Sequence, residues 1–380
     1  MSLVIRPIET PTAFRAFFEF PWRLYRDDPN WVPPLLSMRR ELLDPQQNPA
    51  WAYLDGQYFG AWCDGQLVGT ITALVNHRHN DYWDEDVGWF GTFETIDDQA
   101  VATALLDTAS EWVRARGYSA IRGPQSFTMH EETGLLVRNF NRPVLMNAYN
   151  PPYYEALIKN AGFEPMLDTV CFYYDRQLAQ QHDFRSRLQR IASRATRSGR
   201  VQVRTLDRTR RHADLQLFRD IYNRAWDKNW GFVPMTDDEL DALIENLGML
   251  VDPDLAFFAE VDGEAVGFAL AVPDFNELLH AAYPRPAVPE WWTLARIVWD
   301  WKVRKIVRGA RLVFLGVVDG HRDQGIDIAL LYHVFDALDD SPYTHIDCGW
   351  VLETNPLVQI SLKLGADMYK THRYYQKSLS

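Results

Sequence analysis

The sequence predicts an α+β fold in which a mixed, mostly antiparallel sheet flanked by helices occurs twice. Three observations predict it. Segments recur in the same order along the chain, and the spacing of apolar residues alternates between the period of a strand and that of a helix. The length of 380 residues suits two domains of ordinary size. A hydrophobic content of 47% is sufficient for two packed cores.

Three recurring segments define the two copies. The first is a hairpin turned at Asp64-Gly65 and again at Asp262-Gly263. The second is a strand that leads into a helix, GTFETIDDQAVATALLDTA at 91–109 and GVVDGHRDQGIDIALLYHV at 316–334. The third begins at Asn150-Pro151 and again at Asn355-Pro356. We therefore expect an N-terminal domain at 1–178, an arginine-rich linker at 179–200 and a C-terminal domain at 201–380.

The strands and helices of the second copy follow from their patterning. The apolar run LVFLGVV at 312–318 predicts a strand buried on both faces. A threonine before an apolar periodic run predicts a helix start at Thr236. In chain order, we expect strands at 201–206, 255–261, 265–272, 312–318 and 343–350, helices at 214–227, 236–248, 289–308, 324–338 and 354–364, and two short closing strands.

Charge and cysteine usage exclude several classes of protein. A formal net charge of −12 argues against a general nucleic-acid-binding surface. Cys63, Cys171 and Cys348 have no metal-ligand spacing and are expected to be reduced and buried, so no metal site is predicted. The chain has no apolar run long enough to span a membrane and no signal-peptide layout at its start, so we expect a cytoplasmic protein.

Two segments allow more than one interpretation. The arginine-rich stretch from Arg185 to Arg211 is expected to be a solvated helix and linker, and the alternative is a surface for the phosphates of CoA or tRNA. The helix at 289–308 carries several tryptophans beside basic residues. It is expected to form a lid or a domain seam, and contact with a membrane surface is the alternative.

The turn at 319–327 has the chemistry of an anion site. A glycine-bearing turn at a helix start presents main-chain N–H groups that lack helical partners, and the helix dipole favours a negative charge there. Gly325 lets the backbone approach a ligand closely.

This strand, turn and helix, with Arg322-x-x-Gly325, resemble the signature of the GNAT acetyltransferase superfamily in its tandem, two-domain form. The resemblance implies an N-acetyltransferase or related acyltransferase, with acetyl-CoA or another acyl-CoA as co-substrate and the amine of a small molecule or peptide as acceptor. It implies that the pyrophosphate of CoA lies on the turn. The implied cofactor-binding residues are Val317, Val318, Arg322, Asp323, Gln324, Gly325, Ile326 and Asn355. Homodimerisation would also fit.

The resemblance further implies where the acceptor and the catalytic groups lie. The segment 221–236 corresponds to the acceptor site, with Tyr222, Asn223, Trp226 and Trp230 as candidate wall residues. The Val318 N–H is implied to stabilise the thioester oxygen as it gains charge. The candidate catalytic residues are Asp319, Glu353 and Tyr374.

Some positions depart from the family's pattern. Asp327 stands where a glycine or alanine is usual, and Ser361 stands where a proton-donating tyrosine is usual. The first copy has Asp97 and Ala100 at the positions of Arg322 and Gly325, with Glu94 near the expected slot, so we expect it to bind no cofactor. Two alternative functions remain open. One is a transferase that uses aminoacyl-tRNA, although tRNA is the less favoured partner, and the other is a non-catalytic acyl-CoA-binding protein.

Overall fold

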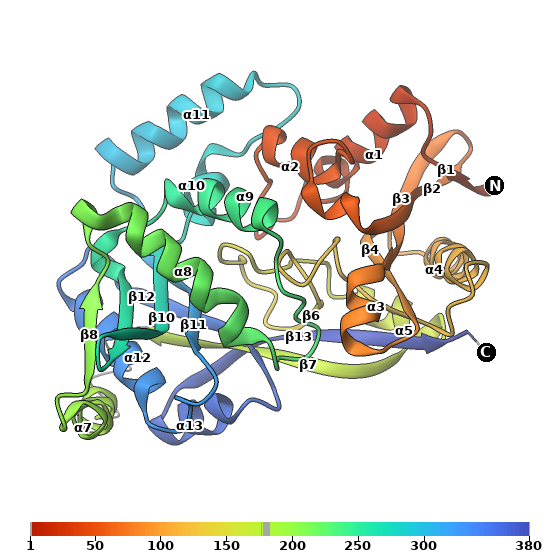
Figure 1. Ribbon diagram of the computed structural model, residues 1–380. Coiled ribbons are helices and arrows are strands. Elements are labelled where there is room, and N and C mark those ends of the chain that lie inside the picture. Colours follow the sequence, from red (N-terminus) through yellow and green to blue (C-terminus); the bar gives the residue numbers. More distant parts are fainter. Residues whose placement is uncertain (1, 176, 178–182, 380) are drawn as a thin grey trace. The chain divides into compact units, whose positions relative to one another are not determined.

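A computed structural model describes residues 2–175, 177 and 183–379. The chain forms two compact units (Figure 1). The first unit comprises Met1–Thr169, Leu278–Lys305 and Lys370–Ser380, and the second comprises Val170–Glu277 and Ile306–Tyr369. The domain boundaries at 178 and 201, which come from the sequence repeat, remain predictions. The segments 278–305 and 370–380 lie within the predicted C-terminal domain in sequence but belong to the first compact unit.

The sheet of the first unit has the strand order β1-β2-β3-β4-β5-β13. Its pairs are antiparallel except for the parallel pair β4 and β5. β2 and β3 form the hairpin predicted at Asp64-Gly65, where both residues have positive φ. The strands are β1 (Leu3–Pro7), β2 (Leu54–Cys63), β3 (Gln66–Asn76), β4 (Val87–Thr95), β5 (Ala120–Gly123), β6 (Leu135–Arg138), which pairs with β13, and β13 (Asp367–Ser378), which enters this unit at Lys370.

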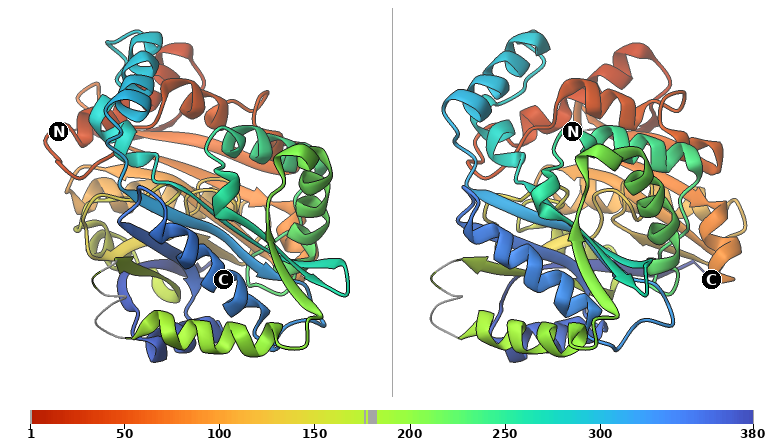
Figure 2. Two further views of the ribbon diagram at one scale, coloured as in Figure 1. Left: turned by 90° about the vertical axis from the view of Figure 1, so that its left-hand side faces the viewer. Right: turned by 60° about the vertical axis from the view of Figure 1, so that its left-hand side comes forward.

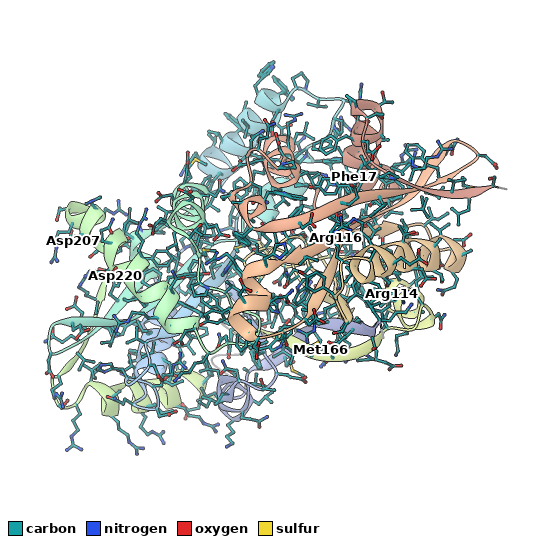
Figure 3. All side chains as sticks on the ribbon, turned by 45° about the vertical axis from the view of Figure 1, so that its right-hand side comes forward. Phe17, Arg114, Arg116, Met166, Asp207 and Asp220 are labelled. Carbon is teal, nitrogen blue, oxygen red and sulfur yellow. The ribbon has the colours of Figure 1, made fainter. Side chains whose placement is uncertain are left out.

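Helix α4 (Gln99–Arg114) packs its apolar face on this sheet and forms the centre of the first core. Leu105, Leu106 and Ala109 are fully buried there beside Tyr375 of β13. Arg114 lies at the end of α4 (Figure 3). Its Nε donates to the carbonyl of Leu379, 3.0 Å away. The other helices of this unit are α1 (Pro11–Leu24), α2 (Leu36–Leu43), η1 (Pro49–Ala52), α3 (His77–Trp83), α5 (Tyr154–Asn160), α11 (Glu290–Val298) and the π-helical turn η4 (Trp299–Val303).

The sheet of the second unit has the strand order β7-β12-β11-β10-β9-β8. The predicted hairpin at Asp262-Gly263 joins β9 and β10, and β11 runs parallel to β12. The strands are β7 (Glu164–Asp175), which enters this unit at Val170, β8 (Val201–Thr205), β9 (Ala256–Val261), β10 (Glu264–Pro273), β11 (Gly309–Val317) and β12 (His345–Leu352).

Two helices of the second unit position the site described below. α8 (Arg211–Trp226) packs on β10 and β11, and α12 (Ile326–Asp339) packs on β9, β10 and β11. α7 (Phe184–Thr196) lies along α12 (Figure 2). The remaining helices are η2 (Arg208–Arg210), α9 (Asp237–Gly248), η3 (Pro253–Leu255) and α13 (Pro356–Leu364), and α10 (Asn276–Ala282) crosses from the second unit into the first.

The α+β class, with a mostly antiparallel sheet flanked by helices, is confirmed. The predicted helices at 214–227, 236–248, 324–338 and 354–364 correspond to α8, α9, α12 and α13. Two predictions were wrong. The closing pair of short strands is one long strand, β13, and the helix predicted at 289–308 ends at Val303 through a π-helical turn. Of the predicted linker, residues 179–182 lie outside the described residues and 184–196 form α7.

Candidate functional site

The candidate site begins where β11 ends and the chain turns into α12. Three residues of this loop, Gly320, Asp323 and Gly325, have φ values of +86°, +62° and +76°. Gly325 occupies the N-cap position of α12, and no side chain caps the helix from that position. A residue with a β-carbon would be strained at this φ, which explains glycine at the helix entrance.

The main-chain N–H groups of this loop are available to a ligand. Within the described part of the chain, the amides from Arg322 to Ile326 have no protein acceptor. Consecutive unpaired amides at the positive end of a helix dipole form an anion site. The loop can therefore bind a phosphate or pyrophosphate group through its backbone.

Asp327 does not occupy these amides. Its carboxylate accepts a hydrogen bond from Ile328 N at 2.9 Å and another from its own N–H. Burial raises the pKa of this carboxyl group above its usual range. Asp327 thus caps α12 one residue inside the helix, and it adds a negative charge beside the loop.

Arg322 braces the loop. Its guanidinium donates to the carbonyl of Val317 at 3.2 Å and to the carbonyl of Ala225 at 2.9 Å. These bonds join the end of β11, the loop and the end of α8. In this structure Arg322 positions the loop, and its side chain is one-third exposed.

A slot opens between β11 and β12. The two strands pair from Gly309 and His345 as far as Leu312 and Cys348, and no pairs follow although both strands continue. Past that point the facing edge of β11 is not paired with β12. An extended ligand can lie against this edge and hydrogen-bond to it.

The expected role of the Val318 N–H was wrong. This N–H donates to the carbonyl of Val266 on β10, at 2.8 Å, so it already completes a sheet hydrogen bond. Backbone groups of adjacent residues in a strand point to opposite edges. Val317, paired opposite Gly267, therefore directs its N–H to the slot, while its carbonyl accepts from Arg322.

Aromatic side chains from α8 form one wall beside β11. A β-carbon at Gly316 would lie 2.5 Å from the ring of Trp226, so this glycine makes room for the indole. Tyr222 is buried against Trp226 and Phe314. Asn223 exchanges hydrogen bonds with the backbone of Met235 and so holds the segment after α8 in place. Trp230 is partly buried in that segment.

The candidate catalytic residues belong to two different units. Asp319 is exposed and ion-paired with Lys228, whose hydrogen bond holds the pKa of Asp319 below its usual range. Glu353 is exposed directly after β12. Tyr374 belongs to the first unit, where it is buried and its hydroxyl donates to Thr133 Oγ1 at 2.6 Å. It is therefore not part of the compact unit that contains the loop.

Asn355 has a structural role. Its Oδ1 accepts a hydrogen bond from Leu357 N at 2.9 Å, which caps α13. Another carboxylate of β12, Asp347, is fully buried with Arg311 and the hydroxyl of Tyr369. Both residues stabilise the fold around the slot.

A pair of hydroxyl groups was missed by sequence reasoning. Ser361 on α13 occupies the position of the family's usual tyrosine, and its hydroxyl hydrogen-bonds with that of Tyr174. Tyr174 lies on β7, where it packs on Phe184 and Phe335, and burial raises the pKa of its hydroxyl. No local pattern in the sequence links Tyr174 with Ser361, because β7 and α13 meet only through the tertiary fold.

The arginine-rich segment is partly engaged with the second unit. Arg185 pairs with Asp336 and Asp339 at the C-terminal end of α12. Beyond α7, Arg200 pairs with Asp262, and Arg204 pairs with Asp214 and Glu260. These three arginines form ion pairs within the second unit.

The corresponding loop of the first unit is closed. The carboxylate of Asp98 accepts from Ala100 N at 2.8 Å and from Val101 N at 3.2 Å, so it occupies the amides at the start of α4. The slot is filled as well, because Gly91 of β4 lies directly against the carbonyl of Gln125. The geometry leaves no space for a cofactor at these positions.

The first unit instead contains a buried carboxyl group, Glu94, near the end of β4. Its Oε2 accepts from the hydroxyl of Tyr25 at 2.7 Å and from that of Tyr154 at 2.8 Å. Burial raises the pKa of Glu94 to about 7, against the opposing effect of Arg39. Glu94 can therefore exchange a proton near neutral pH.

The described residues contain no group of three or more His, Cys, Asp or Glu side chains arranged to hold a metal ion. Among the helices of the described segments, none is both long enough and apolar enough to cross a bilayer.

Two curated proteins match almost the whole chain. Protein YghO of Escherichia coli is 32% identical, with 99% of this chain and 95% of that protein covered. The bacterial ceramide synthase of Caulobacter vibrioides is also 32% identical, with 100% and 98% covered. The chain belongs to their family. No family model matches it.

Solved structures identify the fold of this family. A tandem GNAT protein from the clavulanic acid biosynthesis pathway superposes with a TM-score of 0.52 at 10% identity, covering 100% of this chain and 99% of that chain. A GCN5-related N-acetyltransferase from Sphaerobacter thermophilus gives 0.51 at 12% identity, with 99% and 96% covered. The predicted resemblance to the GNAT superfamily in tandem form is thereby confirmed at the level of the fold.

Proposed function

We propose that this protein is an acyl-CoA-dependent N-acyltransferase that joins a fatty acyl group to the amine of a long-chain amino alcohol. The open amides from Arg322 to Ile326 are the observation that carries the proposal, because they suit the pyrophosphate of CoA. The acceptor class comes from the relative named a bacterial ceramide synthase. A ceramide is the amide of a fatty acid with a long-chain amino alcohol.

The second unit would bind acyl-CoA along β11. The pyrophosphate would receive hydrogen bonds from the amides of Arg322, Asp323, Gln324, Gly325 and Ile326. The pantetheine arm would lie in the slot and pair with the edge of β11 at Val317, and Val318, directly after the strand, would hold that edge in place through its hydrogen bond to Val266. The aromatic wall of Tyr222, Trp226 and Trp230 would receive apolar parts of the substrates.

In the reaction the amine nitrogen attacks the thioester carbonyl, a C–N bond forms and the C–S bond breaks. The nitrogen loses one proton and the departing sulfur of CoA gains one. We assign the first proton to Glu353, because β11 and β12 are parallel and end at the same side of the slot. The hydroxyl pair of Tyr174 and Ser361 is our candidate for returning a proton to the sulfur.

The proposal is tested by incubating the protein with hexadecanoyl-CoA or acetyl-CoA and with sphinganine or a small primary amine. Free thiol and amide product are measured together. We expect amide formation with sphinganine, and a Glu353→Gln variant that still binds CoA but turns over at least tenfold more slowly. Binding of acyl-CoA without thiol release for any amine would contradict an enzyme and favour the non-catalytic alternative.

A further inference from the structure

Helix α11 and the turn η4 show an apolar surface to solvent. Thr293, Ile297 and Asp300 are buried and lie on one side of the helix. The other sides are exposed, with 67% of Trp291 and 57% of Trp299 accessible. The exposed apolar side chains of this segment are Trp291, Trp292, Leu294, Val298, Trp299 and Val303.

This surface is unusual for the molecule. Half of the large apolar side chains that stand exposed in the described ranges lie in this one segment, and they include all three exposed tryptophans found there. An apolar patch of this kind marks a site of interaction, because water contact with several tryptophans is unfavourable.

The helix is held in this orientation by polar contacts. Glu290 accepts hydrogen bonds from the N–H and the hydroxyl of Ser37, at 3.0 and 2.9 Å, at the start of α2. At the other end, buried Asp300 binds Arg304 at 2.7 Å. The start of α11 is therefore tied to α2, the Asp300–Arg304 pair lies within the segment itself, and the tryptophans are exposed. Figure 2 shows α11 projecting from this unit beside α1 and α2.

Basic residues border the apolar surface. Arg296, Lys302, Arg304 and Lys305 lie in or directly after the helix. Of its two acidic residues, Glu290 accepts from Ser37, and Asp300 pairs with Arg296 and Arg304. Lys302 also lies over the ring of Trp301, with Nζ 4.1 Å from its centroid. Tryptophan beside lysine and arginine is typical of helices that lie in the interface of a membrane.

We propose that α11 and η4 dock the protein on the surface of a bilayer that contains anionic phospholipids. The tryptophans would enter the headgroup region, and the basic border would face the lipid phosphates. A second copy of the chain is a poorer occupant, because a twofold interface would place two basic borders against each other. The inference rests on the exposed residues of the helix and is independent of the proposed acyl transfer.

Sedimentation with vesicles tests the proposal without any assay of activity. The full-length protein is mixed with vesicles that contain phosphatidylglycerol, or with vesicles of phosphatidylcholine alone. We expect sedimentation with the anionic vesicles, weakened by salt, and at least tenfold less binding for Trp291→Ser/Trp299→Ser and for Lys302→Glu/Lys305→Glu.

Matched variants control for loss of an apolar or basic side chain elsewhere. Met249→Ser removes another exposed apolar group, and Arg6→Glu/Arg15→Glu reverses two exposed charges of the first unit. These variants should sediment as the wild type does. Equal binding by all variants, or no binding by the wild type, would overturn the proposal. A wild-type dimer that the tryptophan variant dissociates, with unchanged vesicle binding, would assign the surface to a second copy.

Discussion

At the scale of single residues, the charge on Asp327 sets how strongly the loop can attract an anion. The carboxylate caps α12 at Ile328, next to the open amides, and burial already disfavours its ionised form. Removing one negative charge a few ångströms from a pyrophosphate should contribute about 1 kcal/mol, or about fivefold in affinity. We expect Asp327→Asn, which keeps a capping oxygen, to bind CoA about fivefold more tightly by calorimetry.

The control for this variant is Asp340→Asn, which removes a charge at the opposite end of the same helix. It should bind CoA as the wild type does. Weaker binding by Asp327→Asn would show that the carboxylate supports the loop and that its charge is no obstacle.

Glu94 should make stability depend on pH. Folded Glu94 has a pKa of about 7, above its ordinary value of 4.5, so the folded state holds a proton that the unfolded state releases between these values. Its contribution to stability is therefore lost as pH rises through this window. The groups that face it are Tyr25, Tyr154, Arg39 and Glu132.

We expect the melting temperature of Glu94→Gln, relative to that of the wild type, to rise from pH 5 to pH 8. Glutamine is neutral, so the variant does not bear the cost of ionising a buried carboxyl group. Differential scanning fluorimetry at both pH values measures this. Glu9→Gln, at an exposed position, should give no such gain. Parallel pH profiles for Glu94→Gln and the wild type would refute the assignment.

At the scale of elements, the sequence was sufficient to predict those strands, turns and helices whose signals lie within the element itself. The hairpins at Asp64-Gly65 and Asp262-Gly263, the buried strand β11 and the capped helix α9 all follow from turn residues, apolar runs and a Thr236 capping box. The direction of the Val318 N–H could not be predicted, because it depends on the register of β11 against β10, and that register shifts at Leu270 and Ala271.

Partners that are distant in sequence were also beyond prediction. The sequence repeat assigns Tyr374 to the C-terminal domain, whereas the tertiary fold places it with Thr133 in the first unit. The meeting of Tyr174 with Ser361 has the same character. The sequence identified the loop from Arg322 to Ile326 because all its parts are contiguous.

At the scale of the whole molecule, two copies of one fold present different loops. In the first unit Asp98 occupies the helix-start amides and the backbone of Gln125 fills the slot, whereas the second unit leaves both open. A chain with two GNAT-like units should therefore bind one CoA. This difference is what makes the second unit the proposed cofactor-binding half.

Calorimetric titration of CoA into wild type, Gly325→Glu and Ala100→Glu tests this claim most directly. Ala100 aligns with Gly325 in the sequence repeat and lies in the first turn of α4, whereas Gly325 is the N-cap of α12, so each variant places a negative charge at the start of the corresponding helix. We predict one CoA per chain for the wild type and for Ala100→Glu, and binding at least tenfold weaker for Gly325→Glu. Loss of binding in Ala100→Glu with retention in Gly325→Glu would contradict the account.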